Sequence, residues 1–281
     1  MQKLKNYKFL AIPAQIWFGV FLTLPVVLVV LISFATKGTY GYVQWIFQWK
    51  SYETALQPAY LGIFLKSITI ASVTATTCLT LAFFMSWAMA TASKEKRRLW
   101  MTILMLPFLT NLIIRVYAIK LFVGVDGPLQ SFLQFLGLSV DPFIFTANPV
   151  LVFYGMITTY LPFALFPLYA AFEKFDFDLV ESAIDLGANY GQIIFKILIP
   201  NLKPALVSAF SLVFIPSLGE YVIPDLLGGA KQMYLGSLIV ENFLKSRNWP
   251  LGAAVSIWIF IILVLFLMFA NLLKRNRHGR A

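Results

Sequence analysis

Acidic residues in apolar surroundings are the side chains of this sequence best suited to chemistry. Glu220 is the clearest, because it lies within the stretch PSLGEYVIPD, whose glycine and prolines interrupt a regular helix. A charge inside a membrane is costly, so a carboxylate there is a candidate functional group by default. The breaks around it would also let backbone carbonyls face a cavity. The alternative is that Glu220 pairs with Arg115 or Lys120, the two basic residues of another apolar stretch.

Three other carboxylates are weaker candidates. Asp225 follows the same stretch and has a second interpretation as a cap for the turn before Gly228 and Gly229. Asp126 and Asp141 each stand beside a Gly or Pro break, where turn chemistry accounts for an aspartate without any ligand.

The sequence offers few residues suited to enzymatic catalysis. His278 is the only histidine and lies in a basic tail, and Cys78 is the only cysteine, within an apolar run. These residues form no catalytic triad and no metal-ligating cluster. The phosphate-binding pattern GxxxxGK[ST] is also absent from the sequence, so the chain cannot hydrolyse ATP by itself. The sequence predicts a non-enzymatic protein with no cofactor, in which Cys78 is a small core residue.

Composition indicates a membrane protein. Of 281 residues, 60% are hydrophobic and only 12% are charged. Apolar runs of about 20 residues predict transmembrane helices, and hence an all-α fold in a single transmembrane domain, residues 1–281. The predicted spans are 11–33, 62–92, 99–122, 147–172, 203–224 and 249–273. The net charge of +10 does not indicate nucleic-acid binding, because the basic residues stand beside the spans.

Two of these spans have further features. The first follows a basic start, and its apolar run is longer than the core of a signal peptide, so we expect an uncleaved helix. The second contains small residues suited to close packing between helices: Ala71, Ser72, Ala75 and Ala82.

Lysine and arginine set the predicted orientation. They are concentrated in the N-terminal tail, the segment 94–98, the segment between the fourth and fifth spans, and the C-terminal tail. The positive-inside rule therefore places both termini in the cytoplasm, and an even number of spans agrees. Two outward segments remain: 34–61, which is rich in Tyr and Trp, and 123–146, whose short apolar piece predicts an interfacial or re-entrant helix.

The segment 175–206, FDFDLVESAIDLGANYGQIIFKILIPNLKPAL, lies on the predicted cytoplasmic side and is amphipathic. Asp178 and Glu181 have the spacing of a capping box, which predicts a helix from about Leu179. Ala183 and Gly187 are four residues apart, so they would share a face without bulk that another protein could approach closely. The alternative is a surface helix that lies in the headgroup region.

This segment resembles the EAA loop of ABC importer permeases, whose pattern is E-A-A-x3-G-x9-I-x-L-P. Here Glu181, Ala183, Gly187, Ile197 and Pro200 match the pattern, and Ser182 and Ile199 are mild departures from it. The resemblance implies the permease fold of type I importers and a cytoplasmic coupling loop over residues 175–201. It also implies that a separate ATPase docks on the matching residues and Ser182. Asp185 is a further docking candidate, because it lies four residues from Glu181 and a partner with basic groups would offset the repulsion between the two carboxylates.

Three longer segments, 106–120, 161–176 and 225–254, resemble the spermidine/putrescine transport permeases. This resemblance implies two copies of an ATPase, a second permease subunit that is a paralogue, and an external polyamine-binding protein. The location implied is the inner membrane, in contact with lipid. Transport would proceed by alternating access.

Polyamines are flexible polycations, so their path should offer carboxylates and aromatic faces. The candidates are Glu220, Tyr221, Asp225, Tyr160, Tyr117 and Trp249. The aromatic members have an alternative place in the interfacial belt, and Arg115 and Lys120 argue against a cation path beside them.

Two other functions are compatible with parts of the sequence. An ABC permease with a different solute would share this frame. An ion-coupled secondary transporter would need more intramembrane carboxylates than Glu220, and internal inverted repeats, which the sequence does not display.

Overall fold

The structure is a computed structural model that describes residues 7–138, 148–229 and 232–275, and these residues are predominantly helical. The elements are α1 (Tyr7–Ser33), β1 (Thr36–Lys37), β2 (Val43–Gln44), α2 (Lys50–Ala55), α3 (Pro58–Thr91), α4 (Lys94–Met105), η2 (Leu106–Leu109), α5 (Leu112–Val123), α6 (Pro128–Phe135), α7 (Pro149–Glu173), α8 (Asp178–Asp185), α9 (Tyr190–Gln192), η4 (Ile193–Leu198), α10 (Ile199–Leu218), α11 (Val222–Leu227), α12 (Leu235–Val240), η5 (Glu241–Lys245) and α13 (Trp249–Arg275). The two strands pair antiparallel, with Thr36 opposite Gln44. The predicted all-α fold is confirmed.

The chain divides into two compact units. Unit 1 comprises residues 1–62 and 238–262, and unit 2 comprises residues 63–237 and 263–281. Each unit is described by itself.

In unit 1 the aromatic segment after α1 forms a small cluster of rings. The ring of Phe34 lies 4.9 Å from Trp49 and 5.1 Å from Tyr52, measured between centroids. The hydroxyl groups of Ser33 and Tyr52 are 2.8 Å apart. Lys37 donates a hydrogen bond of 2.9 Å to the carbonyl of Ser246, which ties the strand pair to the turn before α13.

In unit 2 the small residues of α3 lie against α7, as their types predict. Ala71, Ala75 and Ala82 are fully buried, and Ser72 is half-buried. Cys78 is buried in the same stripe, and its thiol lies 3.9 Å from the carbonyl of Ile157. Small side chains allow the two helices to approach closely.

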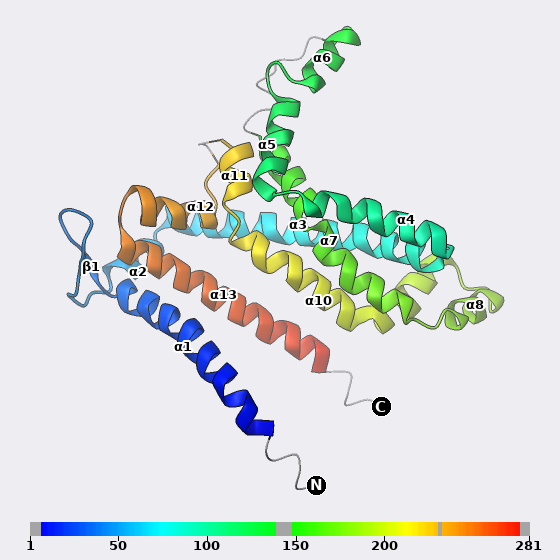
Figure 1. The fold of residues 1–281 in the computed structure, drawn as a ribbon, viewed down its shortest axis with the longest axis horizontal. Coiled ribbons are helices and arrows are strands. Elements are labelled where there is room, and N and C mark those ends of the chain that lie inside the picture. The colour runs from blue at the N-terminus through cyan, green and yellow to red at the C-terminus, as the bar shows by residue number, and fades with distance from the viewer. Residues whose placement is uncertain (1–6, 139–147, 230–231, 276–281) are drawn as a thin grey trace. The chain divides into compact units, whose positions relative to one another are not determined.

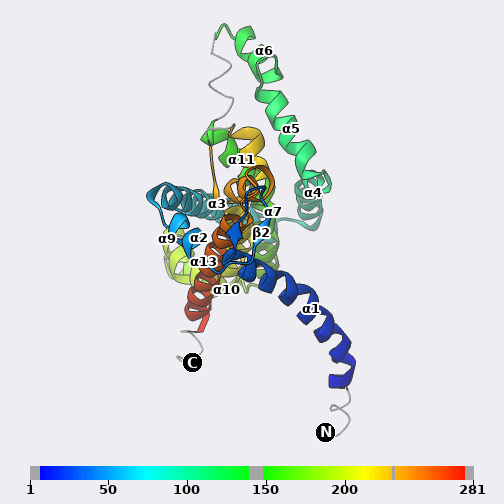
Figure 2. The same ribbon diagram turned by 90° about the vertical axis from the view of Figure 1, so that its left-hand side faces the viewer.

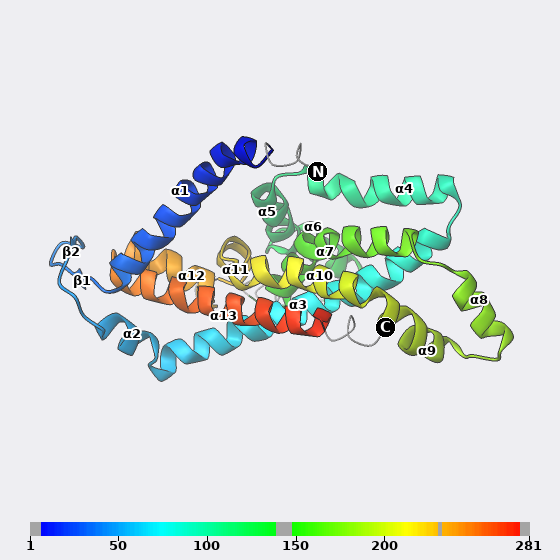
Figure 3. The ribbon, with the colours of Figure 1, turned by 90° about the horizontal axis from the view of Figure 1, so that it is seen from below.

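The helices α7 and α10 run antiparallel as the main packed pair of unit 2 (Figures 1 and 3). At 25 residues, α7 is about 38 Å long, sufficient for the bilayer core of about 30 Å. The end of α13 joins this pair, because the ring of Phe266 lies tilted against that of Phe214, with 4.7 Å between centroids.

Five helices in the described part of the chain are long and apolar enough to cross a membrane. They match five of the six predicted spans. The third predicted span, 99–122, is instead divided into α4, the 3₁₀ turn η2 and α5, and Figure 2 shows α4, α5 and α6 following one another along one side of unit 2. Pro107 has no backbone N–H to continue a helix, and the side chain of Asn111 starts α5 by accepting the N–H of Ile113 at 2.8 Å.

The fifth span differs from its prediction at both ends. The helical run begins at Tyr190 rather than 203 and ends at Leu218 rather than 224. Gly219 ends the helix, so Glu220 lies in the link to α11 and not within the span. In the segment 123–146, α6 confirms the predicted short helix, while Asp141 lies outside the described residues.

Candidate functional site

The predicted coupling loop, residues 175–201, starts with a helix at the expected place but with a different cap. α8 begins at Asp178, and no side chain caps it from the residue before, Phe177. The carboxylate of Asp176 instead accepts the N–H of Asp178 at 3.1 Å. The predicted capping box of Asp178 and Glu181 is therefore wrong, because Asp178 is itself the first helical residue. Glu181 is exposed and available to a partner.

The way α8 ends explains why position 187 is a glycine. This glycine has φ +81°, a conformation that side chains with a Cβ rarely adopt. Its N–H donates to the carbonyl of Ile184 at 2.8 Å, and the N–H of Ala188 donates to that of Ala183 at 2.9 Å. This pair of bonds is a Schellman motif, which closes a helix. Gly187 thus ends the helix. The face without bulk that the sequence predicts for Ala183 and Gly187 does not continue past this residue.

A second helix begins two residues later with a true capping box. The side chain of Asn189 accepts the N–H of Gln192 at 2.9 Å, and the side chain of Gln192 accepts the N–H of Asn189 at 3.1 Å. The helix continues through the π-helical turn η4 into α10. Ile197 and Pro200 lie half-buried in this stretch. Two caps and a positive-φ glycine therefore fix the loop as a short helix followed by a sharp turn.

The loop also carries an apolar surface that the sequence reasoning missed. Leu186 is 89% exposed and Tyr190 is 76% exposed, with Leu179 and Ile184 also exposed beside them. Glu181, Ser182 and Asp185 are exposed on the same short helix. We name this set of seven residues the docking surface, after the role that the resemblance to the EAA loop predicts for this segment. The signal available in the sequence was the presence of Leu179, Ile184 and Leu186 in a segment predicted to lie outside the membrane spans.

The base of the loop is held to α4 by an ion pair. Arg97 at the start of α4 contacts Glu173 at the end of α7, with 3.2 Å between nitrogen and oxygen. Arg97 also donates to the carbonyl of Ala90 at 3.1 Å. These contacts of Arg97 tie the end of α7 to α4 and α3, and from this end the chain continues toward the docking surface.

Glu220 lies at the other end of the α7–α10 pair, where it holds α11. One carboxylate oxygen accepts the N–H of Val222 at 2.8 Å and that of Ile223 at 3.3 Å. The second oxygen accepts a hydrogen bond from the hydroxyl of Tyr160, on α7. Arg115 donates instead to Thr110, at 3.2 Å to its carbonyl. Glu220 therefore contacts the Tyr160 hydroxyl and the first backbone N–H groups of α11. These contacts replace the pairing with Arg115 or Lys120 that the sequence offered as an alternative.

Close packing also fixes α11 on α7. Ile223 and Leu227 are fully buried against the groove at Gly155. A Cβ at Gly155 would lie 2.7 Å from Leu227 Cδ1 and 2.9 Å from Ile223 Cγ2. Figure 1 shows α8 and α11 at opposite ends of the α7–α10 pair. The molecule thus has a docking surface at one end of this pair and a tightly held short helix at the other.

The predicted pathway residues are only partly brought together. Tyr160 and Glu220 are in contact, and Tyr160 is buried, so its ring offers no open face. Tyr221 and Asp225 are exposed on or beside α11, which packs against α5, the helix that carries the exposed Tyr117. Trp249 belongs to unit 1, where its ring lies edge-on to Phe243 at 6.1 Å.

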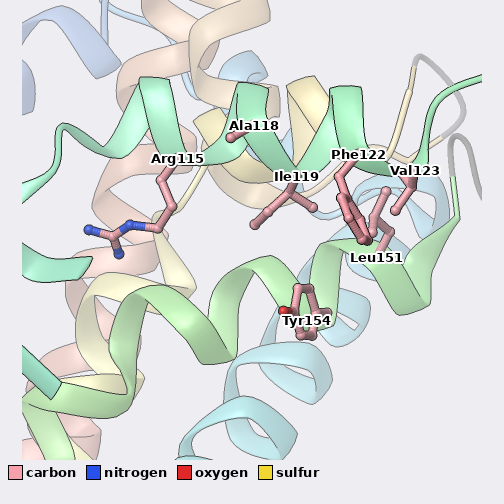
Figure 4. Close-up of a pocket in the computed structure, with 7 residues that line it drawn as sticks. All are labelled: Arg115, Ala118, Ile119, Phe122, Val123, Leu151 and Tyr154. Carbon is pink, nitrogen blue, oxygen red and sulfur yellow. The ribbon is translucent and has the colours of Figure 1, made fainter. Parts of the chain in front are cut away.

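A cavity of about 530 Å³ lies between α5 and α7 (Figure 4). Arg115 points from α5 toward α7 at one end, and Tyr154 stands opposite Ile119. The rest of the lining is apolar: Ala118, Ile119, Phe122, Val123 and Leu151. An ammonium group would be repelled by the guanidinium of Arg115, so this cavity does not suit a polycation.

Comparisons with known proteins agree with this geometry. Residues 80–278 match the family described as binding-protein-dependent transport system inner membrane component. The spermidine/putrescine transport system permease protein PotB of Salmonella typhimurium (strain SL1344) is 36% identical over 252 residues, covering 90% of this chain and 88% of that protein. PotB of Haemophilus influenzae is 34% identical over 268 residues, covering 94% of each chain.

A solved structure gives the same fold. A chain of a bacterial alginate ABC transporter, in complex with an alginate pentasaccharide-bound periplasmic protein, aligns with a TM-score of 0.75. The alignment covers 98% of this chain and 95% of that chain at 18% identity, so it bears on the fold alone. Together with the apolar helices, these matches show that the chain belongs to the binding-protein-dependent transport system inner membrane component family and is a permease subunit of an ABC importer.

Proposed function

We propose that this permease moves polyamines such as spermidine or putrescine into the cytoplasm by alternating access. The cargo follows from the relatives named as spermidine/putrescine permeases, which are 34–36% identical over most of the chain. An ABC permease for another solute shares the fold and is the competing assignment. Binding of radiolabelled spermidine and putrescine to the solute-binding protein that stimulates this transporter separates the two. Failure of that protein to bind either polyamine would remove the polyamine assignment.

The energy would come from a separate ATPase that docks on the docking surface. The observation that carries this proposal is the exposure of two large apolar side chains, Leu186 and Tyr190. Leu186 lies between two helices that are long and apolar enough to cross a membrane, and Tyr190 is the first residue of the second. Burying a large apolar side chain contributes about 1.5–3 kcal/mol, so an exposed leucine beside acidic Glu181 and Asp185 suits a protein partner with apolar and basic groups. Ser182, Ala183, Gly187, Ile197 and Pro200 would shape the same interface.

The remaining parts of the complex are proposed from the family. Two ATPase copies would act on this chain and on a paralogous second permease, and an external polyamine-binding protein would deliver cargo. Both termini would be cytoplasmic, on the side of the docking surface. ATP-driven closure of the ATPases would move the two loops together and open the path outward.

The cargo path would use the exposed groups near α11. Tyr221 and Asp225 offer a ring face and a carboxylate, and Tyr117 on the neighbouring α5 offers a second ring. Glu220 and Tyr160 would act behind them by holding α11 in place. Trp249, at the start of α13, is a separate candidate for a ring contact with cargo.

The docking proposal is tested by substituting Leu186 with Ser and Glu181 with Lys in the assembled transporter. Leu186→Ser should bind the ATPase at least about tenfold more weakly, since the lost apolar burial alone corresponds to that factor. Glu181→Lys should also weaken binding, because it places a positive charge against the basic groups of the partner. Leu244→Ser is the matched control, because Leu244 is also exposed, at 72%, and lies in unit 1. Co-purification of the ATPase and polyamine uptake into proteoliposomes are the measurements. Normal ATPase binding and uptake in both loop variants would leave α8 as a surface helix in the headgroup region.

A further inference from the structure

A second groove lies between α3 and α7, away from the docking surface. Its volume is about 440 Å³. The lining residues are Lys66, Thr69, Ile70, Val73, Pro149, Val150, Phe153 and Tyr234. Pro149 is the first residue of α7, so the groove begins at the end of α7 opposite to the one that leads to α8.

Lys66 provides a fixed positive charge at this groove. Its amine donates a hydrogen bond to the side-chain oxygen of Gln232 and lies 4.9 Å from the centre of the Tyr234 ring. A lysine amine has three donors, so the contact with Gln232 leaves donors for a ligand. The two neighbours orient an exposed side chain that would otherwise be free to move.

The rest of the groove is apolar and lies along helices that cross the bilayer. Ile70 and Val73 follow Lys66 along α3 at helical spacing, and Val150 and Phe153 face them from α7. Both helices are long and apolar enough to span a membrane. Lys66 stands near the start of α7, which is the depth at which lipid headgroups lie beside a spanning helix. A charge at headgroup depth above an apolar groove matches the shape of a phospholipid.

We propose that this groove binds one anionic phospholipid, with its phosphate at Lys66 and an acyl chain along Ile70, Val73 and Phe153. A free phosphate would use the amine but not the apolar length of the groove. A zwitterionic lipid would fill the groove but gain less from the amine, because its own ammonium group opposes the charge of Lys66. The lipid would come from the outer leaflet if the docking surface is cytoplasmic.

Native mass spectrometry of the full-length chain in detergent tests this directly. Phosphatidylglycerol and phosphatidylethanolamine with the same acyl chains are titrated separately, and the adducts are counted. The wild-type chain should bind phosphatidylglycerol about fivefold more tightly, the factor expected for one basic residue near a lipid surface. Lys66→Gln should remove this preference, and Lys66→Arg should keep it.

Two further variants separate the charge from the groove. Val73→Trp should fill the groove and reduce binding of both lipids while leaving Lys66 in place. Lys120→Gln, which removes an exposed lysine on α5, should change neither lipid. Equal binding of the two lipids by the wild-type chain would overturn the proposal, as would an unchanged preference in Lys66→Gln. It would also be overturned if inorganic phosphate displaced the bound species from wild type and Val73→Trp alike, because the amine alone would then account for binding.

Discussion

The hydroxyl of Tyr160 donates a hydrogen bond to Glu220 across a separation of 60 residues, and the same carboxylate caps the start of α11. The contact joins the middle of α7 to the link after α10. Glu220, which the sequence predicts to be a charge inside the membrane, therefore holds a short helix in place. This contact leads to a prediction that distinguishes two roles of Glu220: holding α11 in place and contacting the cargo.

We expect Tyr160→Phe and Glu220→Gln to lower polyamine uptake by similar factors while the complex still assembles. Tyr160→Phe removes one partner of a half-buried carboxylate, which costs about 1–3 kcal/mol of stability. Glu220→Gln retains an oxygen for the N–H of Val222 but loses the charge. Uptake into proteoliposomes and thermal unfolding of the purified complex are the measurements. A direct cargo contact would give a different pattern, with uptake retained in Tyr160→Phe and lost in Glu220→Gln.

Gly155 supplies a second prediction, on the packing of α11. In Gly155→Ala the new methyl group would lie under 3.0 Å from Ile223 and Leu227, which are fully buried and have little room to move. We expect a net loss of about 1–3 kcal/mol of stability and reduced uptake.

The matched control for this packing is Gly62→Ala. Gly62 lies in α3, and a methyl group added there would have no neighbouring atom within 4 Å, so alanine should add up to about 1 kcal/mol through helix propensity. Thermal unfolding should therefore shift in opposite directions for the two variants. A shift in the same direction would mean that α11 is not tightly packed on Gly155.

Gly187 gives a third prediction, on the docking surface. Its φ of +81° makes alanine costly there, by about 1–2 kcal/mol, whereas asparagine tolerates this conformation better. Gly187→Ala should therefore uncouple ATP hydrolysis from transport more than Gly187→Asn does. The ratio of ATP hydrolysed to polyamine transported in proteoliposomes measures the coupling.

The opposite order would support the interpretation from the sequence. If a small face at Gly187 were what the ATPase approaches, the larger asparagine would be the more harmful substitution. Equal effects of the two variants would argue against both the backbone conformation and the small face as the reason for glycine at this position.

Much of the fold could be predicted from local patterns in the sequence. Apolar runs predicted five helices that the structure contains, because a helix that crosses a membrane satisfies its backbone within a single segment. The small residues Ala71, Ala75 and Ala82 were expected at a helix interface and are buried in one. The position of the segment 175–201 between two spans also followed from the sequence, while its role as a coupling loop came from the resemblance to the EAA pattern and stays a prediction.

The end points of elements were less accessible from the sequence. Asp178 and Glu181 had the spacing of a capping box, but the box forms at Asn189 and Gln192, since the first helical residue is decided by competing caps a few residues apart. The break between α4 and α5 was missed for the same reason: hydropathy averages over a window and does not register a cap at Asn111.

The sequence by itself determined which segments are apolar helices, which loop matches the coupling motif, and that Glu220 is an unusual charge. Only the tertiary structure decided what that charge does. Tyr160 and Gly155 on α7 are distant in sequence from Glu220 and the start of α11, and their contacts arise from the packing of α7, α10 and α11. A carboxylate's role depends on the groups within hydrogen-bonding distance, and residue spacing along the chain carries no information about neighbours that only the fold brings together.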